Sequence, residues 1–137
     1  MAWTTPRTWI AGEVPDAAML NLHVRDNLLY LVGDAAWTAP TLTNGWLNFG
    51  SGFTVAGYRK IGDLVWLKGT VKSGTLGAAM FTLPVGFRPL ASGQTVNIVE
   101  SNNLLGRVDV LSTGAVATGG VGSNAYVQLD GIVFSTI

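Results

Sequence analysis

Side chains that commonly carry catalysis or hold metal ions are scarce in this sequence of 137 residues. His23 is the only histidine and there is no cysteine, which excludes thiolate catalysis and cysteine-ligated metal sites. His23 lies between Leu22 and Val24 in a helical pattern, where a lone histidine more often packs or faces solvent than acts as a base. A zinc site needs clustered ligands. We therefore expect no metal ion and no cofactor.

Paired carboxylates could hydrolyse glycosides. The second half of the chain offers four acids for such a pair, namely Asp63, Glu100, Asp109 and Asp130. Three of them have an ordinary structural interpretation: Asp63 follows a glycine in a turn, Asp109 alternates with valines, and Asp130 precedes a glycine. The nucleophile motif Gly-x-Ser-x-Gly is also absent. The sequence therefore predicts a protein with no catalytic residues, and not an enzyme.

Aromatic side chains are the feature with the most binding potential. Five of them could form a stacking surface for sugar rings: Trp37, Trp46, Tyr58, Trp66 and Tyr126. The alternative, which we favour, is that most of these rings fill the core or a subunit interface.

The charge balance narrows the classes of partner. Eight basic and eight acidic residues give a net charge of zero, and charged residues make up only 12% of the chain. No basic stripe is present to neutralise phosphates, which argues against nucleic-acid binding as the main role. The low charge suits a chain whose surface is partly buried against other chains. Neither a signal peptide nor a membrane span is expected.

One amphipathic helix is predicted between Pro15 and Gly33, with Asp16 as its N-cap and Gly33 just past its end. Apolar residues at helical spacing form a stripe, with a polar residue at a near-seam position that could fix register. We expect the following residues at an oligomer interface: Leu20, Val24, Asn27, Leu28 and Leu31. Such a helix packs either on its own β-domain or in a short bundle with copies of itself, and we favour the bundle.

The segment before the helix is an arm with two tryptophans and no periodicity. Trp3, Trp9 and Ile10 are its large apolar residues, and a free tail would rarely expose them. We expect them to anchor the arm on a partner protein. The alternative is that the arm folds back on the β-domain of its own chain.

The rest of the chain alternates short β-like runs with glycine-rich turns. About eight runs at 8–12-residue spacing predict a mainly β domain, an antiparallel β-sandwich or jelly-roll-like head. We therefore divide the chain into residues 1–36, an attachment arm and helix, and residues 37–137, a β-sandwich head domain.

Short motifs along nearly the whole chain resemble structural proteins of tailed bacteriophages. The runs Thr4–Glu13 (TTPRTWIAGE) and Leu20–Leu28 (LNLHVRDNL) look like the N-terminal segment common in these proteins. Further motifs resemble the β-rich head of phage tail-fibre, minor-tail and head-decoration proteins, and they are Pro40–Leu42, Gly45–Trp46, Gly57–Lys60, Gly62–Asp63, Val65–Gly69, Leu83–Pro89, Gly106–Val110 and Leu129–Ile132.

The resemblance implies a non-enzymatic virion component, usually a homotrimer with an N-terminal attachment element and an outward β-domain. Because the chain is short and lacks shaft repeats, we first expect an external capsid decoration or head-fibre knob that docks through its arm. The alternative is a receptor-binding tip or minor tail protein that binds the host surface. The expected partners are further copies of the chain, major capsid or tail proteins, and a host-surface glycan or protein. The protein would be made in the host cytoplasm and displayed on the particle exterior.

Overall fold

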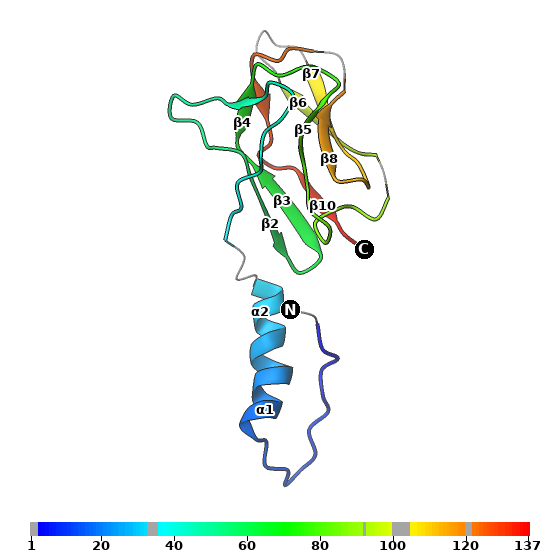
Figure 1. The fold of residues 1–137 in the computed structure, drawn as a ribbon. Coiled ribbons are helices and arrows are strands. Elements are labelled where there is room, and N and C mark those ends of the chain that lie inside the picture. The colour runs from blue at the N-terminus through cyan, green and yellow to red at the C-terminus, as the bar shows by residue number, and fades with distance from the viewer. Residues whose placement is uncertain (1–2, 33–35, 92, 100–104, 120–121) are drawn as a thin grey trace.

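The computed structural model describes residues 3–32, 36–91, 93–99, 105–119 and 122–137. Figure 1 shows a β-rich head at one end and a single helix at the other, with the N-terminal arm beside the helix. The predicted fold class is confirmed, since the chain is mainly β, its sheets are antiparallel, and one helix precedes them.

The helix comprises α1 (Ala17–Leu20), a π-helical turn η1 (Asn21–Arg25) and α2 (Asp26–Val32). Asp16 caps it as predicted, because its side chain accepts a hydrogen bond from the Met19 amide at 2.7 Å. In the π turn the Asp26 amide donates to the Asn21 carbonyl, five residues earlier. The predicted end at Gly33 lies outside the described residues.

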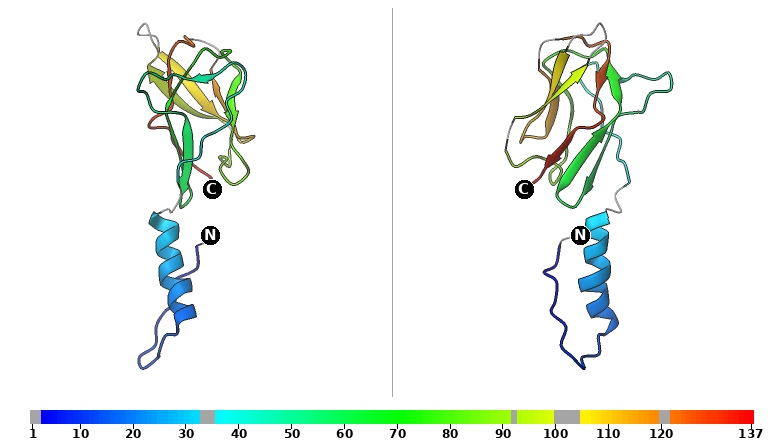
Figure 2. Two further views of the ribbon diagram at one scale, coloured as in Figure 1. Left: turned by 60° about the vertical axis from the view of Figure 1, so that its left-hand side comes forward. Right: turned by 180° about the vertical axis from the view of Figure 1, so that it is seen from behind.

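The arm folds back on the helix of its own chain, which neither of our expectations foresaw. A turn reverses the chain before the helix, with the Glu13 amide donating to the Ile10 carbonyl at 3.0 Å and Gly12 at φ +82°. The arm then lies alongside the helix and runs in the opposite direction, as all three views show (Figures 1 and 2). It does not pack on the β-domain.

Ten strands follow in the described part of the chain. They are β1 (Leu47–Asn48), β2 (Gly57–Ile61), β3 (Leu64–Lys68), β4 (Thr70–Lys72), β5 (Ala79–Thr82), β6 (Gln94–Val99), β7 (Leu105–Val110), β8 (Ala115–Thr118), β9 (Val127–Gln128) and β10 (Val133–Ser135). All pairings are antiparallel, in three sheets ordered β1-β4-β9, β10-β3-β2 and β5-β8-β7-β6.

Residues 64–72 and 126–134 each alternate in sequence like one strand, but in the structure each run is broken in the middle, and the two breaks lie side by side. Gly69, at φ +104°, separates β3 from β4, and a Cβ there would overlap the backbone of Val55. Its carbonyl accepts from the Leu129 amide at 2.8 Å, and its amide donates to the Asp130 carboxylate at 2.9 Å. At this corner the chain passes from one three-stranded sheet to the other, as strands do at the corners of orthogonal packings.

The core lies between the four-stranded sheet and the two smaller sheets. Its largest fully buried side chains come from all three sheets and from the segment before β1: Trp46, Val65, Val71, Met80, Phe81, Leu83, Val108, Val110, Val116, Val127, Leu129 and Ile132. Burying apolar area of this kind is the dominant stabilising contribution to such a domain.

The head meets the helix at the turn between β2 and β3. The Gly62 amide donates to the Tyr30 carbonyl at 3.1 Å, and the Tyr30 hydroxyl donates to the Asp63 carboxylate at 2.6 Å. This hydrogen bond, with smaller contributions from burial and from the carboxylate's charge, raises the pKa of Tyr30. Asp63 therefore has the structural role expected of it, because its carboxylate binds Tyr30 of the helix.

Candidate functional site

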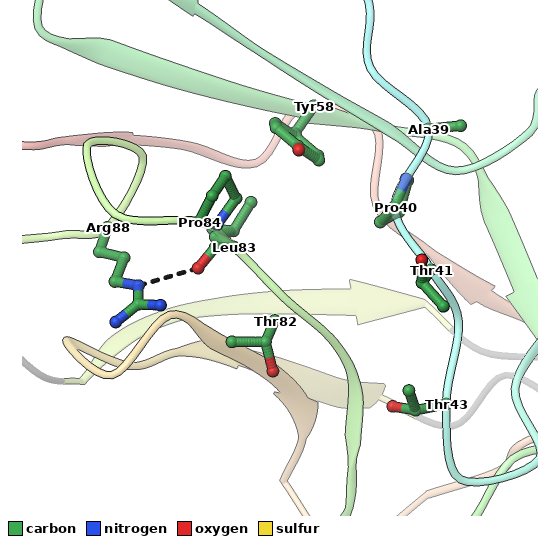
Figure 3. A pocket seen from close by; sticks show the side chains of 9 residues that line it. All are labelled: Ala39, Pro40, Thr41, Thr43, Tyr58, Thr82, Leu83, Pro84 and Arg88. Carbon is green, nitrogen blue, oxygen red and sulfur yellow. Dashed lines mark hydrogen bonds between the residues drawn. The ribbon is translucent and has the colours of Figure 1, made fainter.

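A groove on the head is the concave site considered first. Its volume is about 390 Å³, and Figure 3 shows the nine residues that line it: Ala39, Pro40, Thr41, Thr43, Tyr58, Thr82, Leu83, Pro84 and Arg88. They come from three segments far apart in the sequence: the strand-like approach to β1, the middle of β2, and the chain around the end of β5.

Backbone hydrogen bonds fix both walls of the groove. On one side Thr38 and Tyr58 exchange two backbone hydrogen bonds at 2.9 Å, which hold the segment before Pro40 against β2. On the other side, the Phe87 amide donates to the Pro84 carbonyl at 3.1 Å and closes a tight turn. The Phe87 ring packs edge-on against the ring of Tyr58, with centroids 5.2 Å apart. The walls are thus built before any ligand arrives.

The groove offers hydroxyl groups and one cation. Arg88 is held in place by its Nε, which donates to the Leu83 carbonyl at 2.8 Å (Figure 3). Thr41 and Thr82 supply further hydroxyl groups, whereas the Thr43 hydroxyl already donates to the carbonyls of Ala79 and Met80. No carboxylate is among the nine lining residues. A polar group with acceptor oxygens, such as a sugar hydroxyl or an acidic group, is the chemistry that this lining could hold.

A second surface consists of three aromatic rings at the base of the β1–β2 loop. Phe49, Phe53 and Tyr126 meet edge-to-face, with centroids 4.7 to 5.5 Å apart, and the Lys72 ammonium lies 4.9 Å from the Phe49 centroid. The loop between the two phenylalanines contains three successive residues with positive φ, Gly50 to Gly52. Neither phenylalanine was predicted as part of a surface, although the symmetric run Phe-Gly-Ser-Gly-Phe indicates a glycine-rich turn between two aromatic residues.

The five aromatic residues considered for sugar stacking do not gather into one surface. Trp46 and Tyr58 are 1% and 9% exposed and belong to the core, where our favoured interpretation put most of these rings. Tyr58 lines the groove, and Tyr126 joins the aromatic cluster just described. Trp37 and Trp66 are partly exposed beside the sheet of β10, β3 and β2.

Trp37 has an additional contact role. Its ring lies between two cations, with the Arg59 guanidinium and the Lys68 ammonium each 4.6 Å from its centroid. Cation–π contacts of this kind are favourable and directional. They secure the first residues after the helix to β2 and β3.

The predicted apolar stripe of the helix is exposed in the single chain. Its residues Leu20, Val24, Leu28 and Leu31 are 43–56% exposed, and no part of the head covers them. Beside the stripe, between helix and arm, lies a mainly apolar hollow of about 220 Å³ lined by Trp3, Pro6, His23, Val24, Asn27, Leu28 and Leu31. An unpartnered apolar face of this size commonly marks an interaction site.

Asn27 has a different role from the one predicted for it at an oligomer seam. It is 5% exposed, its Oδ1 accepts from the Thr4 amide at 2.9 Å, and its Nδ2 donates to the Thr4 carbonyl at 2.8 Å. Nδ2 also donates to the His23 carbonyl at 3.2 Å. The Asn27 amide therefore clamps the arm backbone within one chain, because its donor and acceptor match those of an extended peptide.

The arm residues predicted as an anchor contact the helix on one side. Trp3 lies near Tyr30, with ring centroids 5.9 Å apart, and Trp9 meets His23 edge-on at 6.4 Å. Arg7 pairs with Glu13 across the turn. Ile10 is 72% exposed. The arm is thus docked on its own helix while still presenting part of its apolar surface.

Among the described residues no cluster of three or more histidine, cysteine, aspartate or glutamate side chains could hold a metal ion. In the same part of the chain, no helix has the length and apolar character that a bilayer crossing would need.

Comparisons with known proteins give one informative likeness. No protein family model matches the chain, and no curated protein matches it in sequence. Among solved structures, it resembles the receptor binding protein (gp15) of Listeria phage PSA, with a TM-score of 0.64 and 22% sequence identity. The likeness covers 93% of this chain and 82% of that one, so it takes in helix as well as head. At this identity it shows a common fold.

Proposed function

We propose that the chain is a non-enzymatic structural protein displayed on the exterior of a bacteriophage particle, where its β head binds the host surface. The arm and helix assemble copies of the chain and attach them to other virion proteins. Two locations were considered from sequence. We propose the tail, where the protein would bind the receptor, in preference to the capsid, which it would decorate.

The observation that carries the proposal is the extent of the structural likeness. A receptor binding protein of a phage shares the fold over 93% of this chain. The sequence motifs had pointed to phage structural proteins independently of that structure. Fold alone does not determine function, so the proposal also depends on the surfaces that the chain presents.

The exposed helix face supports assembly into a homotrimer. Four aliphatic side chains at helical spacing, beside the hollow between helix and arm, remain 43–56% exposed in the single chain. Copies of the helix packed together would remove these side chains from water, at roughly 25 cal/mol per Å² of apolar area. We propose three copies because the phage fibre and tail proteins that the sequence resembles are usually homotrimers.

The arm supports attachment to the particle. The turn that joins arm to helix lies at the end opposite the head (Figure 1), and Trp9 and Ile10, at or next to that turn, remain 42% and 72% exposed while the arm is docked. Aromatic side chains in this situation are typical anchors at protein interfaces. The head would then point away from the particle.

The groove on the head is the proposed contact with the receptor. Its hydroxyl groups, the cation of Arg88 and the face of Tyr58 suit a host-surface glycan, while a polar protein loop is the other receptor class considered. This assignment needs no catalytic step.

An adsorption experiment tests the proposal. Purified chain, added to host cells in excess, is expected to block adsorption of the phage that carries it, and labelled antibody should locate the chain at the tail. A few copies per particle fit a tail protein. Antibody over the whole capsid and no block of adsorption would instead indicate decoration.

A groove variant and a matched control locate the contact. Thr82→Arg places a long cation in the groove and is expected to abolish the block of adsorption, because Thr82 is an exposed lining residue. Thr75→Arg makes the same change at an exposed threonine outside the groove and should leave the block intact. If both variants block as well as wild type, the receptor is bound elsewhere.

A further inference from the structure

Tyr30 is the point at which arm, helix and head meet. Its ring lies 5.9 Å from that of Trp3 in the arm, at an angle of 55°. Its hydroxyl donates to Asp63 of the head at 2.6 Å, and its carbonyl accepts from the Gly62 amide at 3.1 Å. The Tyr30 ring also lies under Gly62, since a Cβ on that glycine would be 3.7 Å from it. The Tyr30 side chain thus contacts both the arm and the head.

The position of Trp3 depends on how the arm is held. The next residue, Thr4, is clamped by Asn27 through two hydrogen bonds of 2.8 and 2.9 Å. Trp3 is itself 44% exposed, so few other contacts fix its ring. When the hydrogen bonds between Asn27 and Thr4 break, the arm detaches from the helix, and the Trp3 ring moves away from the Tyr30 ring.

The hydrogen bond to Asp63 depends in turn on the orientation of the Tyr30 ring. A tyrosine ring on a helix turns about two side-chain torsions, and a neighbouring aromatic ring restricts both. With Trp3 beside it, the ring stays where its hydroxyl reaches the carboxylate. Without Trp3 the hydroxyl can turn toward water, and a mainly solvent-side hydrogen bond contributes little to holding two parts together.

We infer that the docked arm holds the head in a fixed orientation on the helix through Trp3 and Tyr30, so that release of the arm frees the head to tilt. The biological role of this coupling rests on the proposed function, in which the arm attaches to the particle. Linkage is reciprocal, so anything that binds the released arm favours a tilting head, and anything that draws the head aside weakens arm docking. A chain in solution would carry a fixed head, and a chain whose arm is captured by the particle would carry one that can search for a receptor.

The test measures the distribution of distances between helix and head in the isolated chain. Because the sequence has no cysteine, Ala18→Cys on the helix and Thr82→Cys on β5 accept one spin label each at exposed positions. Labelled chains are diluted with unlabelled chain, so that pulsed dipolar spectroscopy reports distances within one chain. Circular dichroism confirms that every variant keeps its fold.

Four variants separate the coupling from its parts. Tyr30→Phe removes only the hydroxyl, Trp3→Ala removes the ring beside it, and Asn27→Asp opens the clamp without altering either ring. Ile10→Ala is the control, since it shortens an arm side chain that is 72% exposed. The narrow distribution of the unmutated chain is expected to be lost in the first three variants and kept in the fourth.

The result for the two arm variants decides the inference. If Tyr30→Phe broadens the distribution while Trp3→Ala and Asn27→Asp leave it narrow, the arm does not control the head and the inference is wrong. It is equally wrong if Tyr30→Phe changes nothing, or if Ile10→Ala broadens the distribution as much as the others. The measurement needs no phage or host, so its outcome is independent of the adsorption experiment.

Discussion

Replacing Asn27 by aspartate should release the arm with almost no change of shape. The Oδ1 atom that accepts from the Thr4 amide has a counterpart in aspartate, but the Nδ2 donor becomes an oxygen. That oxygen would face the carbonyls of Thr4 and His23, which now receive hydrogen bonds at 2.8 and 3.2 Å. The substitution therefore converts two attractive contacts into two repulsive ones at a site that is 5% exposed.

The size of the effect follows from these contacts. Two lost hydrogen bonds are worth about 1 kcal/mol each, and an acceptor left facing other acceptors in a buried site adds a similar amount. A total of about 3 kcal/mol shifts the docking equilibrium of the arm by roughly 100-fold. Lowering the pH should reverse part of the effect, because protonation of the new carboxyl group restores one donor.

Trypsin cleavage after Arg7 provides the assay. While the arm is docked, the Arg7 side chain is engaged with Glu13 and with the Met19 sulfur, 3.3 Å away. Cleavage that requires opening tracks the open population, so loss of residues 1–7, followed by mass, should accelerate roughly 100-fold in Asn27→Asp. Asn21→Asp makes the same change at an exposed helical position and should cleave like wild type. Equal rates in the two variants would refute the clamp.

Three further predictions concern assembly, packing and pH. Val24→Asp with Leu28→Asp should prevent assembly, because an interface would bury unpaired charge at several kcal/mol; unchanged sedimentation would place the interface elsewhere. Gly74→Ala should lower the melting temperature by roughly 10 °C, because the added Cβ would overlap the ring of the buried Trp46. Gly57→Ala is the control and should melt nearly like wild type, because its added Cβ would meet the flexible side chain of Lys68. The Tyr30 pKa is raised from its usual 10.0, so its hydrogen bond should stabilise the fold fully below that pH and cease to do so once the pH passes the raised pKa. The melting difference between wild type and Tyr30→Phe should vanish over that interval, and a difference that persists would contradict the role of the hydroxyl.

Local patterns predicted the helix well because its signals are local. Asp16 lies directly before the first turn and caps it, and the stripe from Leu20 to Leu31 lies on one exposed face. The segment that packs against the neighbouring face of the helix could not be predicted from such local signals. Asn27 has the spacing of a seam residue, but spacing does not distinguish another helix from an extended arm as the partner.

The β strands were predicted where alternation and turns agree, and missed where a strand bends. The sequence from Leu64 to Lys72 alternates on both sides of Gly69, so its pattern predicts one unbroken strand. The positive φ of Gly69 and its hydrogen bond to Asp130 arise from a contact with a segment about sixty positions away. The groove escaped prediction for the same reason, since its walls come from Pro40, Tyr58 and Arg88 on separate segments.

The π turn of the helix has a geometric consequence for the arm. An extended arm is straight, whereas side chains four apart on an α-helix advance by 400° and drift by roughly 40° per step. Over the two steps from Met19 to Asn27 the drift would reach roughly 80°, and the Asn27 side chain would then no longer face the arm. The extra residue accommodated between Asn21 and Arg25 turns the lower half back by about the same angle. The wide turn thus brings Met19, His23 and Asn27, each of which contacts the arm, toward one face of the helix. A deletion of one residue there would leave a regular α-helix whose two halves dock the arm on different faces.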